Sequence, residues 1–195
     1  TMSTRKGRVV FLEDVLKQAI EKTRETVLSK NPDAKNVDEI SKQVGVGAVV
    51  FQELSNSRIK DYTFSWSRTL SFEGETGPYV QYTHARCCAV LRKANEEVTT
   101  DINYELLSDG DAAEVLKVIG SFNKAIVSAM RRNEPHIVTR FVLDLAQALN
   151  KFYHDNPIIV EDAEVRKARL ALVAATRQTL ENGLAILGMH APERM

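Results

Sequence analysis

The C-terminal segment from Arg169 to Met195 constrains the fold most, because it combines a long helical pattern with an unusual ending. Its apolar residues recur about once per helical turn, at Leu172, Ala175, Leu180, Leu184 and Leu187. This spacing predicts a helix with one buried face, and Gly188 is typical of the residue that follows a helix. Chain ends are usually small and polar, whereas this chain closes with Ala-Pro-Glu-Arg-Met. The ending is therefore a feature to be explained rather than a frayed terminus.

Helical spacing recurs through most of the chain. It predicts helices over residues 12–27, 37–54, 80–91, 111–129, 135–152 and 161–187. Gly45 and Gly47 leave a strand open as an alternative within the second of these, and the alternation of Tyr62, Phe64 and Trp66 predicts a short strand. The expected class is all-α, with a helical bundle whose common core contains Phe122, Ile126, Phe141, Leu145, Leu172, Leu180 and Leu184. The glycine-rich and acidic turn at 73–78 is the expected domain boundary.

Charge balance argues against a generic nucleic-acid binder, which usually has a basic excess. The chain has 26 Lys and Arg against 26 Asp and Glu. The segment from Lys117 to Arg140 is different, because it has five basic residues and one acidic residue. This local excess is either a solvated face or an RNA contact.

Several other classes of protein are not expected. No apolar run approaches the roughly 20 residues that span a membrane, and the start lacks the layout of a signal peptide. The adjacent Cys87 and Cys88 are expected to be reduced thiols, which favours the cytoplasm. No His, Cys or carboxylate pair has the spacing of a metal site, and no serine or cysteine lies beside an obvious base. We therefore expect neither a metal nor an independent catalytic centre.

Tyr153 is the best candidate for a binding residue. Phe152 continues the apolar face of its predicted helix, so that the neighbouring Tyr153 should point outward at the helix end. An exposed ring can stack on an unpaired base, an interaction worth about 1–3 kcal/mol. The alternative is that Tyr153 packs on the last helix with a solvated hydroxyl.

Four stretches together resemble a known family. They are Met-Ser-Thr-Arg-Lys-Gly at 2–7, Asp-Tyr-Thr-Phe-Ser-Trp at 61–66, Leu-Ser-Phe-Glu-Gly-Glu-Thr-Gly-Pro-Tyr-Val-Gln-Tyr-Thr-His-Ala-Arg at 70–86, and the closing residues 191–195. In this order they resemble the C-terminal part of class I arginyl-tRNA synthetases. The resemblance implies a remnant of the catalytic signature loop at 1–10, a small mainly helical segment like a stem-contact region at 11–77, and a DALR-type anticodon-binding bundle at 78–195.

The resemblance also implies a parent activity. Parent enzymes attach arginine to tRNA(Arg) with ATP and Mg, and their N-terminal catalytic domain has no counterpart in this sequence. The chain is therefore expected to be inactive alone and to need no cofactor of its own. The remnant of the signature loop would comprise Met2, Ser3, Thr4, Arg5 and Lys6.

The resemblance further implies that the tail folds back across the bundle, which brings Met195 and Tyr153 to the anticodon loop. Tyr79 and Arg86, which follow the boundary turn, would either touch the tRNA or lock the first bundle helix in place. Tyr79 is expected to be the accessible tyrosine there and Tyr82 the packed one. Arg131 and Arg132 complete the expected tRNA-binding set.

Two functional hypotheses remain open from the sequence. In the first, the chain is a monomer whose partners are tRNA(Arg) and the missing catalytic domain, without DNA or membrane contacts. In the second, it is a structural helical domain that serves domain packing or oligomerisation and reads no anticodon.

Overall fold

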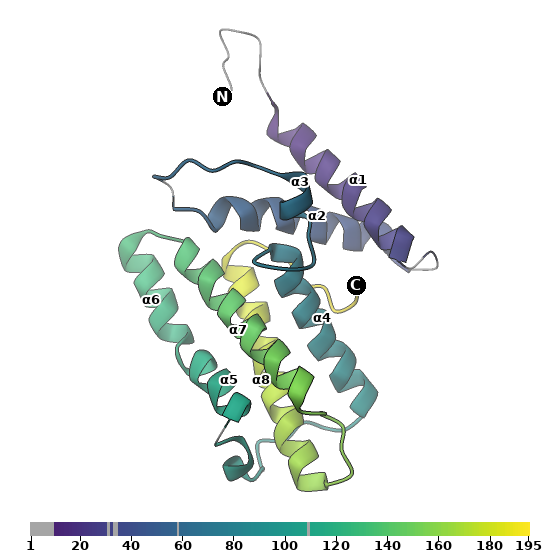
Figure 1. The fold of residues 1–195 in the computed structure, drawn as a ribbon, viewed down its shortest axis with the longest axis vertical. Coiled ribbons are helices and arrows are strands. Elements are labelled where there is room, and N and C mark those ends of the chain that lie inside the picture. Colours follow the sequence, from purple (N-terminus) through teal and green to yellow (C-terminus); the bar gives the residue numbers. More distant parts are fainter. Residues whose placement is uncertain (1–9, 31, 33–34, 58, 109) are drawn as a thin grey trace.

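A computed structural model describes residues 10–195 with the exception of 31, 33–34, 58 and 109. All regular structure in the described residues is helical (Figure 1), which confirms the predicted all-α class. The helices are α1 (Leu12–Lys30), α2 (Val37–Leu54), α3 (Trp66–Thr69), α4 (Gly77–Ala94), the 3-10 helix η2 (Tyr104–Leu107), α5 (Gly110–Gly120), α6 (Phe122–Arg132), α7 (His136–Asp155) and α8 (Ala163–Ile186).

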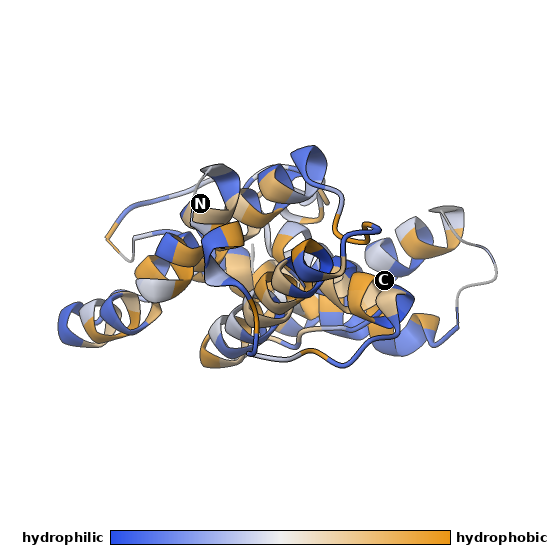
Figure 2. Cartoon of the chain, turned by 90° about the horizontal axis from the view of Figure 1, so that it is seen from below, coloured by the Kyte–Doolittle hydropathy of each residue, from blue (hydrophilic) through white to orange (hydrophobic). Residues whose placement is uncertain are grey.

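Helices α4, α7 and α8 form the centre of a bundle, and α5 and α6 follow one another along the outer side of α7 (Figure 1). Five residues of the predicted core are buried there, namely Phe141, Leu145, Leu172, Leu180 and Leu184. Phe122 and Ile126 are partly buried and pack against them. Hydrophobic and hydrophilic residues alternate around the helices (Figure 2), as expected for amphipathic helices that share a core. No helix in the described part of the chain is both long enough and apolar enough to cross a bilayer.

The helical pair α1 and α2 lies across one end of the bundle, where α2 packs on α4 (Figure 1). Two glycines of α2 permit these close crossings. A Cβ atom at Gly45 would lie 2.8 Å from the carbonyl oxygen of Ala19 on α1, and one at Gly47 would lie 2.9 Å from Nε2 of Gln81 on α4. Residues 37–54 are therefore a helix and not a strand. Gly45 and Gly47 occur in it because the neighbouring helices pack too closely for a side chain.

Two predictions of secondary structure are wrong. Residues 62–65 are not a strand, because the described chain has no strand to which their backbone groups could bond. Instead the hydroxyl of Tyr62 donates to Glu53 on α2, and the rings of Phe64 and Trp66 pack edge to face. The helix predicted over 111–129 is also interrupted, since α5 ends at Gly120 and α6 begins at Phe122. Glycine and serine are weak helix formers, and the Ser121 hydroxyl donates to the Val118 carbonyl, which competes with the helical ladder.

The ends of α4 and α8 determine where the chain travels next. The Thr76 hydroxyl accepts a hydrogen bond from the backbone N–H of Tyr79, so the predicted turn at 73–78 leads directly into α4. At the end of α8, Gly188 has a φ of 72°. The N–H groups of Gly188 and Met189 then donate to the carbonyls of Ala185 and Leu184, which is a Schellman ending. The chain consequently reverses after α8 and returns along the bundle.

Candidate nucleic-acid interface

The tail after α8 is held against α4 by side chains that bind its carbonyl groups. Gln81 donates through Nε2 to the His190 carbonyl at 2.8 Å. His84 Nδ1 lies 3.0 Å from the Pro192 carbonyl, and both terminal nitrogens of Arg92 lie 3.2 Å from the Glu193 carbonyl. The expected return of the tail across the bundle is therefore present in the structure. As a result, Met195 lies beside α4.

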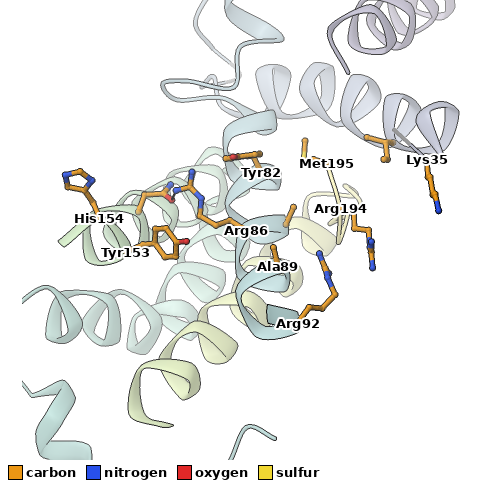
Figure 3. Close-up of a pocket in the computed structure, with 12 residues that line it drawn as sticks. Lys35, Tyr82, Arg86, Ala89, Arg92, Tyr153, His154, Arg194 and Met195 are labelled. Atoms are coloured by element: carbon orange, nitrogen blue, oxygen red, sulfur yellow. Dashed lines mark hydrogen bonds between the residues drawn. The ribbon is translucent and has the colours of Figure 1, made fainter. Parts of the chain in front are cut away.

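A groove of about 990 Å³ crosses α4 between the tail and the end of α7. Tyr153 and His154 lie on one side of α4, Lys35, Arg194 and Met195 lie on the other, and Arg86 and Ala89 lie between them (Figure 3). The complete lining comprises Lys35, Ile40, Tyr82, Ala85, Arg86, Ala89, Arg92, Asn150, Tyr153, His154, Arg194 and Met195.

The lining of the groove is cationic. It contains one lysine and three arginines, and none of the described residues that form it is acidic. The chain as a whole has no net charge, but the groove has a local excess of positive charge. Such an excess attracts phosphates, and it lies beside aromatic rings that offer faces for stacking.

Arg86 organises the centre of the groove. Its guanidinium donates to Oδ1 of Asn150 at 2.7 Å. Its carbon Cζ lies 5.0 Å from the ring centroid of Tyr82 and 5.3 Å from that of Tyr153, within the range of a cation–π contact. The amide nitrogen of Asn150 donates in turn to the hydroxyls of Tyr79 and Thr83, both at 2.9 Å. These bonds fix the cation between two aromatic rings.

The predicted outward position of Tyr153 is confirmed, because 38% of this residue is exposed at the end of α7. The relative accessibility predicted for the two α4 tyrosines is wrong. Tyr82 is 40% exposed, whereas Tyr79 is half-buried against the core and bonded to Asn150. Because α4 packs against α2, α7 and α8, more than one of its faces is buried. Tyr79 lines a second, smaller cavity of about 570 Å³ that shares Arg86 and Met195 with the groove.

Arg131 and Arg132 are exposed at the end of α6, immediately before α7 begins. Tyr153 lies near the opposite end of α7, and a helix rises by 1.5 Å per residue, so about 25 Å separates the two sites. The structure therefore does not bring this arginine pair into the groove. The predicted loop residues Met2, Ser3, Thr4, Arg5 and Lys6 lie outside the described residues.

Some lining residues were missed by sequence reasoning. Tyr82 and Ala89 lie at helical spacing from Arg86, which was predicted, and this signal could have shown that they share a face of α4 with it. Lys35 and Arg194 join the groove from the ends of distant segments. Their contribution depends on the path of the tail and has no local signature.

Three buried titratable groups lie on α4, and one of them, His84, contacts the tail. Burial lowers the pKa of His84 below its ordinary value of 6.5, although its bond to the Pro192 carbonyl opposes the shift. Burial raises the pKa of the Cys87 thiol to about 12 and also raises that of Cys88. Among the described residues, no group of three or more His, Cys, Asp or Glu side chains is arranged to hold a metal ion.

Comparison with known families shows to which family the chain belongs. Residues 80–195 match the family model of the DALR anticodon binding domain. The chain belongs to this family. Residues 1–66 match a second model, the catalytic domain of class I (R) tRNA synthetases. The resemblance stated from the sequence is thus confirmed. Most of the groove lies in the DALR anticodon-binding domain, and Lys35 and Ile40 join it from the range of the second match.

Relatives of this DALR chain are arginine–tRNA ligases. The chain is 81% identical over 195 residues to the Clostridioides difficile ligase, covering all of this chain and 34% of that protein. It is 60% identical to the Halothermothrix orenii ligase with the same coverage. Among solved structures, Thermus thermophilus arginyl-tRNA synthetase superposes with a TM-score of 0.87 at 34% identity, over 96% of this chain and 32% of that one. The chain therefore spans about a third of the length of its relatives.

Proposed function

We propose that this chain is the C-terminal, tRNA(Arg)-binding portion of an arginine–tRNA ligase and that its groove receives the anticodon loop. The observation that carries this proposal is the meeting of Tyr153, Arg86 and Met195 in one groove. They come from three segments that are distant in sequence, and the described lining contains no acidic residue. An anticodon loop offers both ligands that such a lining fits, namely unstacked bases and phosphates.

Each member of the groove has a distinct role in this proposal. Tyr153 offers a half-exposed ring on which a base can stack. Met195 offers a flexible apolar side chain that can adapt to a second face of the same loop. Arg86 keeps the ring of Tyr153 in place, and Lys35, Arg92 and Arg194 provide phosphate-binding charge.

The parent reaction follows from the family. We infer that the complete protein attaches arginine to tRNA(Arg) with ATP and Mg, and that the chain alone does not catalyse this reaction. Positioning ATP and arginine together requires a complete site, and Met2, Ser3, Thr4, Arg5 and Lys6 would supply at most one edge of it. We also propose that the protein is cytoplasmic, which is consistent with the free and buried Cys87 and Cys88, and that it is a monomer.

A role in domain packing is the second candidate. Val10, Phe11 and Leu12 at the start of α1 are each more than half exposed, and the match of residues 1–66 to a catalytic-domain model supports a covering domain on this side. The division of the chain at 1–10, 11–77 and 78–195 remains a prediction. It is supported by the Thr76-capped turn before α4.

Binding of labelled tRNA(Arg) by fluorescence anisotropy separates the two candidates. The probes are a tRNA(Arg) transcript and the same transcript with a replaced anticodon, at one fixed salt concentration. We expect the native transcript to bind about tenfold or more tightly than the replaced one. Equal binding of the two would contradict anticodon recognition and favour the packing role.

A further inference from the structure

The tail from Met189 to Met195 has no regular structure, yet parts of it are buried. Met189 is 6% exposed, and Pro192 is buried as well. Buried backbone carbonyls need hydrogen-bond donors, and a segment outside any helix cannot provide them itself. The donors for the His190 and Pro192 carbonyls come from Gln81 and His84 on α4.

Gln81 and His84 are both buried, and their hydrogen-bonding groups bind the tail. Gln81 is fully buried, and its Nε2 group donates to the Gln43 carbonyl on α2 as well as to the tail. His84 is 1% exposed. A carbonyl oxygen can only accept a hydrogen bond, so Nδ1 of His84 must carry the proton in this contact. Neither side chain lines the groove, which means that each can affect RNA only through what it holds.

We propose that Gln81 and His84 form a latch that positions Met195 in the groove by holding the tail carbonyls of His190 and Pro192. This inference rests on the proposed function, because it assigns positioning residues to the same RNA-binding groove. The latch also joins three parts of the fold, since Gln81 contacts α2, lies on α4 and binds the tail.

Chain geometry gives the expected size of the effect. Met195 lies three residue steps beyond Pro192, so an anchored tail lets Met195 move within about 10 Å. If the tail were released from Gln81, His84 and Arg92 together, it would be held only as far as Gly188, and the seven residue steps to Met195 would allow about 25 Å. The accessible volume would then rise by roughly tenfold, and the effective concentration of Met195 at the groove would fall by a similar factor.

The test uses isosteric variants. Gln81→Met and His84→Leu remove the donors with little change in volume, whereas His84→Asn retains an N–H donor close to the position of Nδ1. Thr139→Val is the matched control, because Thr139 is equally buried but bonds within α7. Circular dichroism first establishes that each variant keeps the helical content of the wild type.

The first readout is hydrogen exchange of the tail amides in the RNA-free protein. We expect amide exchange at 189–191 and 193–195 to become about threefold or more faster in Gln81→Met and His84→Leu, with rescue in His84→Asn and no change in Thr139→Val. Unchanged tail exchange in both donor-removing variants would overturn the latch. This readout does not depend on RNA binding, so it stands even if the proposed function fails.

The second readout is the Kd for a tRNA(Arg) transcript, measured with and without deletion of Met195. We expect His84→Leu to weaken binding by about threefold when Met195 is present, which is less than for complete release because Gln81 and Arg92 still hold the tail. It should have almost no effect when Met195 has been deleted. An equal loss in both backgrounds would show that His84 does not act through Met195 and would overturn the positioning role. If the unmodified chain fails to distinguish tRNA(Arg) from its anticodon-replaced form, the proposed function is wrong.

Discussion

Arg86 on α4 places its guanidinium carbon 5.3 Å from the ring centroid of Tyr153 on α7. The cation therefore lies over a ring that is also partly open to solvent. An arginine in this position supports one face of the aromatic group and adds positive charge beside the ring. A base that stacks on Tyr153 would thus meet a ring that Arg86 already holds in place.

Replacement of Tyr153 tests the stacking role. We expect Tyr153→Ala to weaken binding of tRNA(Arg) by about 1–3 kcal/mol, the usual contribution of one base on one aromatic ring. Tyr153→Phe should keep most of the affinity because it keeps the ring. Tyr104→Ala is the control, since Tyr104 is an exposed tyrosine on η2 outside the groove. Anisotropy titrations that show equal losses for Tyr153→Ala and Tyr104→Ala would contradict the prediction.

Arg131 and Arg132 lie outside the groove, so any tRNA contact there should involve the phosphate backbone. We expect Arg131→Gln and Arg132→Gln each to reduce the slope of log Kd against log salt concentration by about 1. Discrimination between native and replaced anticodons should remain. Lys117→Gln is a suitable control because Lys117 already pairs with Glu114 on α5. If both variants have the same salt dependence of Kd as the wild type, the arginine pair does not contact the tRNA.

Sequence periodicity predicted most of the fold because each long helix buries one apolar stripe. The range 37–54 predicted for α2 agrees with the structure, and α7 and α8 begin within two residues of their predicted starts. Periodicity failed where the deciding contact is local or tertiary. Ser121 ends α5 through a bond to its own preceding turn, and residues 62–65 found no partner strand in the described chain.

The groove could be predicted only in part. The outward position of Tyr153 follows from its place next to Phe152 on α7. The relative exposure of Tyr79 and Tyr82 does not follow, because α4 is covered on several faces and Asn150 binds the hydroxyl of Tyr79. The position of Arg194 depends on tail bonds more than 100 residues apart in sequence. No local pattern encodes such contacts.

Two glycine positions provide a matched test of packing. A Cβ atom at Gly183 on α8 would collide with Val142 on α7, whereas one at Gly120 would meet no atom within 4 Å. We expect Gly183→Ala to lower the free energy of unfolding by about 1–3 kcal/mol through overpacking. Gly120→Ala should be neutral or stabilising by up to about 1 kcal/mol. Urea unfolding followed by circular dichroism measures both, and a stable Gly183→Ala variant would show that α7 and α8 can separate without cost.

Cys87 should be chemically silent in the folded protein. Burial raises the pKa of its thiol to about 12, so it is almost entirely protonated at pH 8, and the thiolate is the reactive form. We expect iodoacetamide at pH 8 to leave Cys87 unmodified in the native chain and to modify it fully in denaturant. Peptide mass spectrometry measures the extent at this site. Rapid native alkylation of Cys87 would mean that the α4 core opens readily.

His84 should make the free energy of unfolding depend on pH. Burial lowers its pKa below 6.5 in the folded state, against the opposing effects of Glu181 and Glu193 and with a lesser contribution from Arg177. The unfolded chain therefore binds the proton more readily than the folded one, so stability is retained above pH 6.5 and falls as the pH drops from there towards the lower folded pKa. Protonation of one group accounts for at most about 1.4 kcal/mol per pH unit. We expect the loss of unfolding free energy between pH 7.5 and 5.5 to be smaller in His84→Asn than in the wild type, since all other titrating groups are shared. Parallel pH profiles for the two proteins would show that His84 is not held neutral by its burial.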